Sequence, residues 1–523
     1  MRKLFWIIIL TLAMTSQVSA QQGAEREEPT AHLRSCRRGT PRRNFSLHRA
    51  PSLSSSENPY IGNRRQLVVL ASFQDQDFED DQATTYQKWN KIFNAENYNE
   101  GNYVGSMHDY FLAQSYGRFN LTFDLLFVKL PDERKKYRST AWHDENSQYM
   151  VDDIVDALQT QNIDWSLYDW NGDSYVDQLL ILYAGKGMDA GGDSTTIWPH
   201  QWWLDQHLNL ETEATDDNRS YRTIICGDKE YYINCYCCVQ EEVNTKNTKS
   251  TFGTLCHEYS HCFGLPDIYY RSIKVVGNWD LMDSGNYNGL GFRPCNYSAH
   301  ERMLMGWITP IELTSDTTVN DIPSLDTEPV AYLIRNDGAE NEFYLLENRQ
   351  QHGWDEKLPG SGILIFHIDY DPSLWVSVTE YVNSSIKKHY SIIMANSYFG
   401  LLDAAGWPYP YVKEDVLGND SLANDCLTNT SEPAATLNNP NLDGELLMSK
   451  PITQMAVDTN GLASFVFKND IATSVAETPR HQEQIRKSGS LMYDLQGRPL
   501  SSPAKGLYIQ GNKLIMRKSS SIK

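Results

Sequence analysis

The chain of 523 residues has no excess of positive charge. Lysine and arginine number 46 against 67 aspartate and glutamate residues, which gives a formal net charge of −21 at pH 7 and a sequence pI of about 5.0. Proteins that bind the phosphates of nucleic acids need clustered cationic surface to displace counterions. We therefore exclude a nucleic-acid partner. The length allows a large buried core and predicts roughly two to four structural units.

Long apolar runs are also missing beyond the N-terminus. The first residues, MRK, precede the apolar run LFWIIILTLAM and the segment TSQVSA, so residues 1–20 are predicted to be a signal peptide with a small-residue cleavage site. No other stretch approaches the roughly 18 apolar residues of a membrane-spanning helix. We expect an exported protein, secreted or held at the cell surface, without a transmembrane span in its mature form.

Patterns along the chain predict several units. Residues 21–63 are polar and arginine-rich, typical of a pro-segment or linker. In 64–310, buried strands at 66–73 and 176–183 alternate with helices at 106–115 and around 151–158, which predicts an α/β domain with a mixed sheet. Short β-like runs in 311–468 predict a β-rich, sandwich-like domain packed against it. Residues 469–523 form a polar tail with two or three short strands.

The most informative stretch is Thr251–Asp267, TFGTLCHEYSHCFGLPD. Its apolar residues recur at helical spacing, with Ser250 or Thr251 as the N-cap. On a helix His257 and His261 lie on one face and can bind one Zn²⁺, while Glu258 points toward the open side of the metal. Gly264 can adopt positive φ and end the helix. Asp267 can then return as a third ligand and leave the fourth position for water.

Two other stretches carry ligand-type residues. Asp169, Asn171, Asp173 and Asp177 place oxygen atoms at alternate positions and are candidate Ca²⁺ ligands, although an Asx-rich turn fits equally well because the EF-hand glycine and distal glutamate are missing. His367, Asp369 and Asp371 form an HxDxD pattern. There we favour polar residues at the end of a strand over a second metal site.

The nine cysteines invite disulfides in an exported chain, but the odd count leaves at least one unpaired. Four of them crowd one segment with a spacing that fits no standard zinc motif, so a disulfide or free-thiol role is favoured: Cys226, Cys235, Cys237 and Cys238. Cys36, in the basic segment, is a candidate temporary zinc ligand that keeps the protein latent. A flexible linker is the alternative.

Met282, in GNWDLMDSG, is a candidate hydrophobic floor beneath the metal, and Tyr287 a candidate donor to an oxyanion. The segments HEYSHCFGLPD, NWDLMDSG and YSAHERMLMGW, with DYFLAQSYG and DWNGDSYVDQLLILYAGKG upstream, resemble the M6 family of metallopeptidases, the immune inhibitor A type, which is metzincin-like. The resemblance implies that His257, His261 and Asp267 hold zinc and that Glu258 is the general base. Metzincins usually have histidine where this chain has Asp267. The tail is similar to sorting or anchoring segments of exported Bacteroidetes-type bacterial proteins, which implies cell-surface attachment.

Two functions follow from these patterns. The first is a secreted zinc-dependent endopeptidase that acts on protein or peptide substrates through a metal-activated water. The second is a secreted binding or adhesion protein with a structural metal site, which would close the site with a fourth protein ligand such as Cys256 or Cys262. Glu258 discriminates between them, because only catalysis needs a carboxylate between the two histidines.

Overall fold

The computed structural model describes residues 58–139, 146–206, 208–209, 214–215, 221–242, 249–271, 273–375, 381–397, 401–414 and 420–469, and the backbone of four short strands within 492–517. The chain divides into two compact units, Met1–Asn469 and Asp470–Lys523. The predicted signal peptide, most of the predicted pro-segment and Cys36 lie outside the described residues. None of the helices described is both long and apolar enough to cross a membrane.

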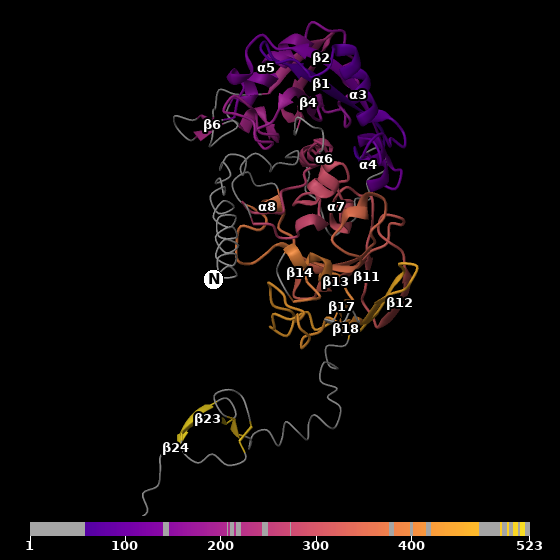
Figure 1. Cartoon of the computed structure of the whole chain (residues 1–523), viewed down its shortest axis with the longest axis vertical. Helices are drawn as coiled ribbons and strands as arrows, with labels where there is room; N and C mark the ends of the chain where they lie inside the picture. The colour runs from indigo at the N-terminus through magenta and orange to yellow at the C-terminus, as the bar shows by residue number, and fades with distance from the viewer. Residues whose placement is uncertain are drawn as a thin grey trace, which may run out of the picture. The chain divides into compact units, whose positions relative to one another are not determined.

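A five-stranded mixed sheet forms the first part of the larger unit (Figure 1). Its order is β2 (Phe119–Lys129), β1 (Gly62–Ser72), β4 (Leu179–Lys186), β10 (Cys235–Glu242) and β5 (His200–Trp203). The first four strands are parallel, and β5 pairs antiparallel with β10. The central strands β1 and β4 are apolar and almost fully buried, as expected for parallel strands covered on both faces. The mixed sheet predicted from the sequence is confirmed.

One predicted strand is divided in the structure. The stretch 176–183 splits between β3 (Tyr175–Val176) and β4, because the Asp177 carboxylate turns back to accept the Trp170 N–H at 2.5 Å. β3 then joins a separate small sheet with β9 (Lys229–Ile233) and β8 (Arg222–Cys226). β6 (Leu208–Asn209) and β7 (Ala214–Thr215) form a further short pair.

Helices pack beside the first sheet, and their starts follow local capping chemistry. α4 (Met107–Gln114) begins with a capping box between Ser106 and Asp109, and α3 (Gln82–Asn94) is capped by Asp81. Both pack against β2. α5 (Ser147–Leu158) buries the apolar side chains at 151, 154, 155 and 158 that predicted it. The predicted helices at 106–115 and 151–158 are therefore confirmed.

A second five-stranded sheet follows, in the order β11 (Ile311–Glu312), β13 (Tyr332–Asn336), β14 (Ala339–Arg349), β15 (Gly362–Asp369) and β16 (Tyr390–Ile392). Strand side chains alternate between faces, so β14 contributes to two hydrophobic cores. Phe343 and Leu345 join the large core that also contains the first sheet and α6 (Phe252–His261). Tyr344 and Leu346 join a smaller core with β12 (Thr317–Ile322), β19 (Ile452–Val457) and β20 (Ala463–Phe467).

The large core therefore runs through the position at which a domain boundary is predicted, residue 310, and reaches Trp407. α7 (Ala299–Leu304) packs on β14 at this junction, as Figure 1 shows. The predicted division at 310 and the sandwich-like arrangement of 311–468 stay predictions. The remaining short elements are η1 (Arg134–Lys136), η2 (Trp165–Leu167), η3 (Leu204–Gln206), η4 (Gly277–Trp279), η5 (Gly285–Gly291), η6 (Gly353–Lys357), α8 (Pro372–Trp375), η7 (Leu401–Gly406), β17 (Tyr411–Glu414) and β18 (Asp420–Asn424).

The smaller unit, taken by itself, contains a four-stranded antiparallel sheet. Its order is β22 (Pro499–Leu500), β21 (Met492–Tyr493), β23 (Gly506–Gln510) and β24 (Lys513–Arg517). The short strands expected in the tail are present.

Candidate metal centre

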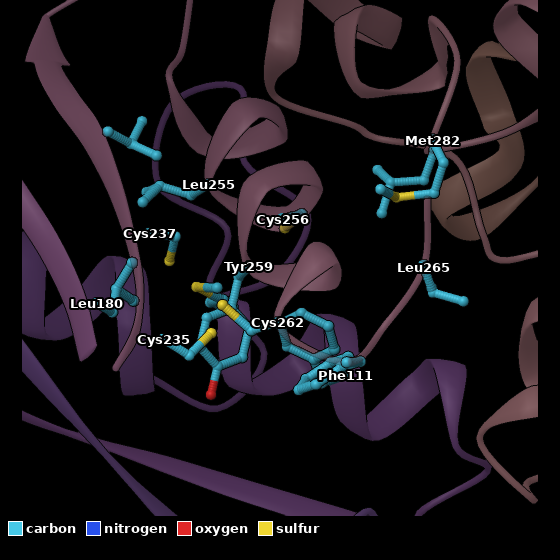
Figure 2. Close-up of a cluster of buried hydrophobic side chains, with 14 of the residues drawn as sticks. Phe111, Leu180, Cys235, Cys237, Leu255, Cys256, Tyr259, Cys262, Leu265 and Met282 are labelled. Atoms are coloured by element: carbon cyan, nitrogen blue, oxygen red, sulfur yellow. The ribbon is translucent and has the colours of Figure 1, made fainter. Parts of the chain in front are cut away.

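The helix that carries the H-E-x-x-H motif is α6. Ser250 Oγ accepts the Phe252 N–H at 3.1 Å, whereas the side chain of Thr251, the residue before the helix, makes no capping bond. Figure 2 shows Leu255, Tyr259 and Cys262 directed toward β10, which contributes Cys235 and Cys237. α6 packs on β10 and β5, so the first sheet supports one side of the motif.

The opposite side of α6 contacts η5. A Cβ atom on Gly253 would lie 1.9 Å from the carbonyl oxygen of Asn286, so only glycine permits this approach. The close contact holds Asn286 and Tyr287 beside the first turn of the helix.

Gly264 reverses the chain after α6, as the sequence predicts. Its φ is +93°, which glycine tolerates, and its N–H donates to the His261 carbonyl at 2.9 Å. Ile268 N–H then donates to the Met282 carbonyl at 2.9 Å and fixes the returning segment. Asp267 is thereby brought back to the two histidines. Asp267 Oδ1 lies 3.3 Å from His257 Nε2 and 3.5 Å from His261 Nε2.

Both imidazoles are oriented by backbone carbonyls. His257 Nδ1 lies 2.8 Å from the Leu281 oxygen, and His261 Nδ1 lies 2.6 Å from the Leu265 oxygen. A carbonyl only accepts, so each Nδ1 carries a proton and each neutral ring presents an Nε2 lone pair to Asp267. Carbonyl contacts of this kind fix the tautomer and the orientation of metal-binding histidines in known zinc sites.

Three acceptors thus face one another in a buried space. His261 Nε2 and both carboxylate oxygens of Asp267 are buried without a hydrogen-bond donor. Burial lowers the pKa of His261, so a proton on this ring does not relieve the repulsion. For Asp267, burial raises the pKa, and the two imidazoles lower it only when a ring carries a proton on Nε2. A divalent cation resolves this arrangement, and the His₂-carboxylate donor set fits zinc.

Among the described residues these three are the only group of at least three histidine, cysteine, aspartate or glutamate side chains whose ligand atoms lie within 4.8 Å of one another. Neither Cys256 nor Cys262 belongs to the group, and neither does any other cysteine that the structure describes. All eight described cysteines are free thiols, and the expected disulfides do not form among them. Burial raises the pKa of Cys235 and of Cys262, which keeps both as inert thiols.

Glu258 is buried and lines a pocket together with His257. Other residues of this pocket are Asp189, Trp198, Pro199, Thr254, Tyr269, Lys274, Asp283, Asn286 and Tyr287. Tyr287 is 57% exposed, which leaves its side chain accessible at the entrance. The pocket is small and opens beside His257 and Glu258.

Met282 lies in a turn held from both sides. Asp280 Oδ1 accepts the Met282 N–H at 2.8 Å, and Asp280 Oδ2 accepts the hydroxyl of Tyr390, from β16, at 2.7 Å. Burial raises the pKa of Asp280 to about 6. Met282 and Leu265 lie on the side of α6 opposite the cysteines (Figure 2). The second sheet therefore helps to position the turn beneath the candidate metal centre.

The candidate calcium loop has a different internal arrangement. Asp169 accepts the N–H groups of Gly172, Asp173 and Ser174, and Asp173 accepts that of Tyr175 at 2.9 Å. These bonds are those of an Asx-rich turn, the alternative that the sequence left open. Calcium binding by Asp169, Asn171, Asp173 and Asp177 stays a prediction.

The sequence did not identify the carbonyls of Leu265 and Leu281, or Asp189 and Lys274 in the pocket. A carbonyl partner leaves no trace in residue identity. Asp189 and Lys274 belong to loops whose course depends on tertiary packing.

A comparison with known proteins gives a matching family model for part of the chain. Residues 65–306 match the model of the family described as immune inhibitor A peptidase M6, catalytic domain. Immune inhibitor A of Bacillus thuringiensis subsp. alesti is 24% identical over 298 residues, covering 49% of this chain and 42% of that protein. The pre-pro-metalloprotease PrtV of Vibrio cholerae serotype O1 is 26% identical over 252 residues, covering 40% of this chain and 26% of that protein. The match spans less than half of the length of either relative. The resemblance stated from the sequence is confirmed.

Proposed function

From a chain whose residues 65–306 are an M6 peptidase catalytic domain, we propose a secreted zinc-dependent endopeptidase that hydrolyses peptide bonds in proteins or peptides. The observation that carries this proposal is the buried set of His257, His261 and Asp267, three acceptors without a donor between them, with Glu258 beside the set in a pocket. An adhesion protein with a structural metal would need a further protein ligand, and none of the eight described cysteines belongs to the group.

In this proposal His257 and His261 hold the metal through Nε2, and Asp267 supplies the carboxylate. The carbonyls of Leu281 and Leu265 keep the rings in the binding tautomer before any ion arrives. When bound, zinc lowers the pKa of a coordinated water to about 7 and polarises the scissile carbonyl. The buried sheet below α6 keeps the site rigid, which limits the reorganisation needed during the reaction.

Glu258 performs the proton transfers. Its carboxylate accepts a proton from the attacking water and delivers it to the leaving nitrogen of the cleaved peptide bond. In the same proposal Tyr287, an exposed residue of the pocket lining, donates a hydrogen bond to the developing oxyanion, and the buried Met282 supplies an apolar floor.

The proposal extends to the rest of the chain in coarser terms. We also keep four predictions made from the sequence: export by residues 1–20, latency through Cys36 in residues 21–63, calcium binding at the Asp169 loop and surface attachment by residues 469–523. We propose a metzincin-like fold because the H-E-x-x-H helix, the glycine turn and the methionine turn follow one another along the chain in this order.

The test is Glu258→Ala, measured for metal content and for cleavage of a fluorogenic peptide mixture and casein. We expect the zinc content to stay at the wild-type value and cleavage to fall by about 10²- to 10⁴-fold, the usual contribution of a general base. Glu230→Ala is the matched control, because Glu230 is an exposed glutamate on β9. Undiminished cleavage by the Glu258 variant, or by metal-free protein, contradicts the mechanism.

A further inference from the structure

One basic side chain stands among the acidic ones around the candidate active site. Of the residues that line the pocket with His257 and Glu258, Lys274 is the only lysine or arginine. The same lining includes the carboxyl groups of Asp189 and Asp283. In a chain with a net charge of −21, this ammonium group is the basic side chain that offsets the acidic ones of the lining.

A short hairpin places Lys274. Tyr270 and Ile273 exchange backbone hydrogen bonds of 3.0 and 2.9 Å, which makes Tyr269 and Lys274 the next pair across the hairpin. The Lys274 ammonium accordingly lies 4.1 Å from the centroid of the Tyr269 ring. This ring is buried, so the contact restricts the lysine to one side of the pocket wall.

The backbone that follows Lys274 is also fixed. Asp283 Oδ2 accepts the N–H groups of Val275, Val276 and Gly277 at 2.7, 2.8 and 2.9 Å. Asp283 Oδ1 accepts the hydroxyl of Ser284 at 3.0 Å. The nearby carboxylate is therefore occupied by other donors, and Lys274 forms no salt bridge with a side chain of the described residues. A cation–π contact uses none of the three N–H donors of an ammonium group.

We propose that Lys274 is a specificity-determining residue that binds a carboxylate of the substrate close to the scissile bond. The inference rests on the proposed peptidase function and names its substrate class: peptides with an aspartate or glutamate beside the cleaved bond, or with a free C-terminal carboxylate there. The surrounding acidic groups repel such an anion, and Lys274 is the basic side chain of the pocket lining that can attract it.

The experiment compares peptides that differ in one group. One pair carries glutamate or glutamine at each position flanking a known cleavage site, and a second pair ends near that site in a free or an amidated C-terminus. The quantity measured is the ratio of kcat/KM within each pair. It is determined for the zinc-loaded wild type, Lys274→Met and Lys274→Glu, with the exposed Lys229→Met as the matched control.

We expect the wild type to favour the acidic member of the pair at one flanking position. Lys274→Met should lower the kcat/KM ratio about five- to ten-fold, because a partly buried ion pair discriminates by about this factor. Lys274→Glu should reverse the preference. Lys229→Met should leave the ratio unchanged. The glutamate–glutamine pair tests recognition of a side-chain carboxylate, and the free–amidated pair tests recognition of the C-terminal carboxylate. A second measurement keeps the test independent of turnover: fluorescence anisotropy of the acidic and neutral peptides on the Glu258→Gln background.

Ratios that are equal in the wild type and both Lys274 variants, in proteins that cleave and melt normally, overturn the role of Lys274 and leave the peptidase function standing. A wild type that cleaves no peptide at all overturns the proposed function instead.

Discussion

Two clusters of histidine and carboxylate lie in this molecule, one on α6 and one at the end of β15, and they differ in what surrounds the carboxylate. At the first, the oxygens of Asp267 receive no hydrogen bond and face two imidazole lone pairs. At the second, Glu342 Oε1 accepts His367 Nε2–H at 2.7 Å, and Glu342 Oε2 accepts Asn336 Nδ2–H and Asn439 N–H, each at 3.0 Å.

The remaining carboxylates of the second cluster are satisfied in the same way. Asp369 accepts the side-chain amides of Asn438 and Asn439 at 3.1 and 3.0 Å, and Asp371 accepts the N–H of Ser373 at 2.9 Å. The HxDxD pattern is therefore a set of polar residues at the end of a strand, the interpretation favoured from the sequence. The difference teaches that the same residue types can form a satisfied polar network or a donor-free group, and the hydrogen-bond donors around the carboxylate distinguish the two.

The largest expected effect separates the two clusters directly. His261→Ala should lose stoichiometric zinc and lower peptide cleavage by at least about 10³-fold, because the metal-dependent part of the rate enhancement is lost. His367→Ala should keep both the zinc content and cleavage within a few-fold of the wild type. Zinc is measured by inductively coupled plasma mass spectrometry and cleavage with a fluorogenic peptide. Equal loss of zinc in both variants would contradict the comparison.

Metal-linked stability gives the next effect. Zinc at about 1,000 times its dissociation constant should raise the free energy of unfolding by about 4 kcal/mol, because the ion binds the folded state. Thermal melts of chelated and zinc-loaded protein should show this rise for the wild type and for His367→Ala, and not for Asp267→Ala. A rise that persists in Asp267→Ala would place the ion elsewhere.

Another buried histidine, His300, sharpens the comparison because no carboxylate of the described residues pairs with it. Burial lowers the pKa of His300 to about 3, and its Nε2 has no hydrogen-bond partner. The folded pKa is below the unfolded one, so its stabilising contribution is complete at neutral pH and is lost as the pH falls below about 6.5. At pH 5 the loss is about 2 kcal/mol.

His300→Phe should remove this loss while it fills the same aromatic surroundings, which include Phe343, Trp375 and Tyr390. Urea unfolding at pH 5 and at pH 7.5 measures this loss of stability. The difference in stability between the two pH values should be about 2 kcal/mol smaller in the variant than in the wild type. An identical difference would show that burial does not lower the pKa of His300 in the folded state.

The smallest effect concerns Glu342. Glu342→Gln keeps the shape of the side chain, but its amide NH₂ would face N–H donors that the carboxylate now bonds as an acceptor. The substitution should therefore destabilise the protein by about 1 kcal/mol. Chemical unfolding measures this change, and the zinc content should remain that of the wild type. A drop in zinc content would show that the second cluster shares the metal.

The elements of the site that depend on helical periodicity were predictable. The four-residue spacing of His257 and His261 and the glycine at 264 are enough to place two rings on one face and to reverse the chain, because both are local properties of the backbone. The approach of Asp267 follows from the short connection. These features need no knowledge of distant contacts.

Features that depend on distant packing were not predictable. The carbonyl of Leu281 contacts the His257 ring although the two residues are 24 positions apart in the sequence. Lys274 lines the pocket only because Tyr270 and Ile273 close a hairpin. The division of the stretch 176–183 depends on a side-chain bond from Asp177 back to Trp170. Of the two roles favoured for the crowded cysteines, disulfide or free thiol, the structure shows free thiols, several of them buried between β10 and α6, and this packing cannot be read from cysteine spacing.

The double-sided burial of β14 has a consequence for processing. Shortening from the C-terminal end can remove the smaller unit up to Asn469 without opening either hydrophobic core, but a cut inside β14 or β15 would expose apolar surface on both sides at once. A fragment cut to the matched residues 65–306 should therefore aggregate when expressed alone.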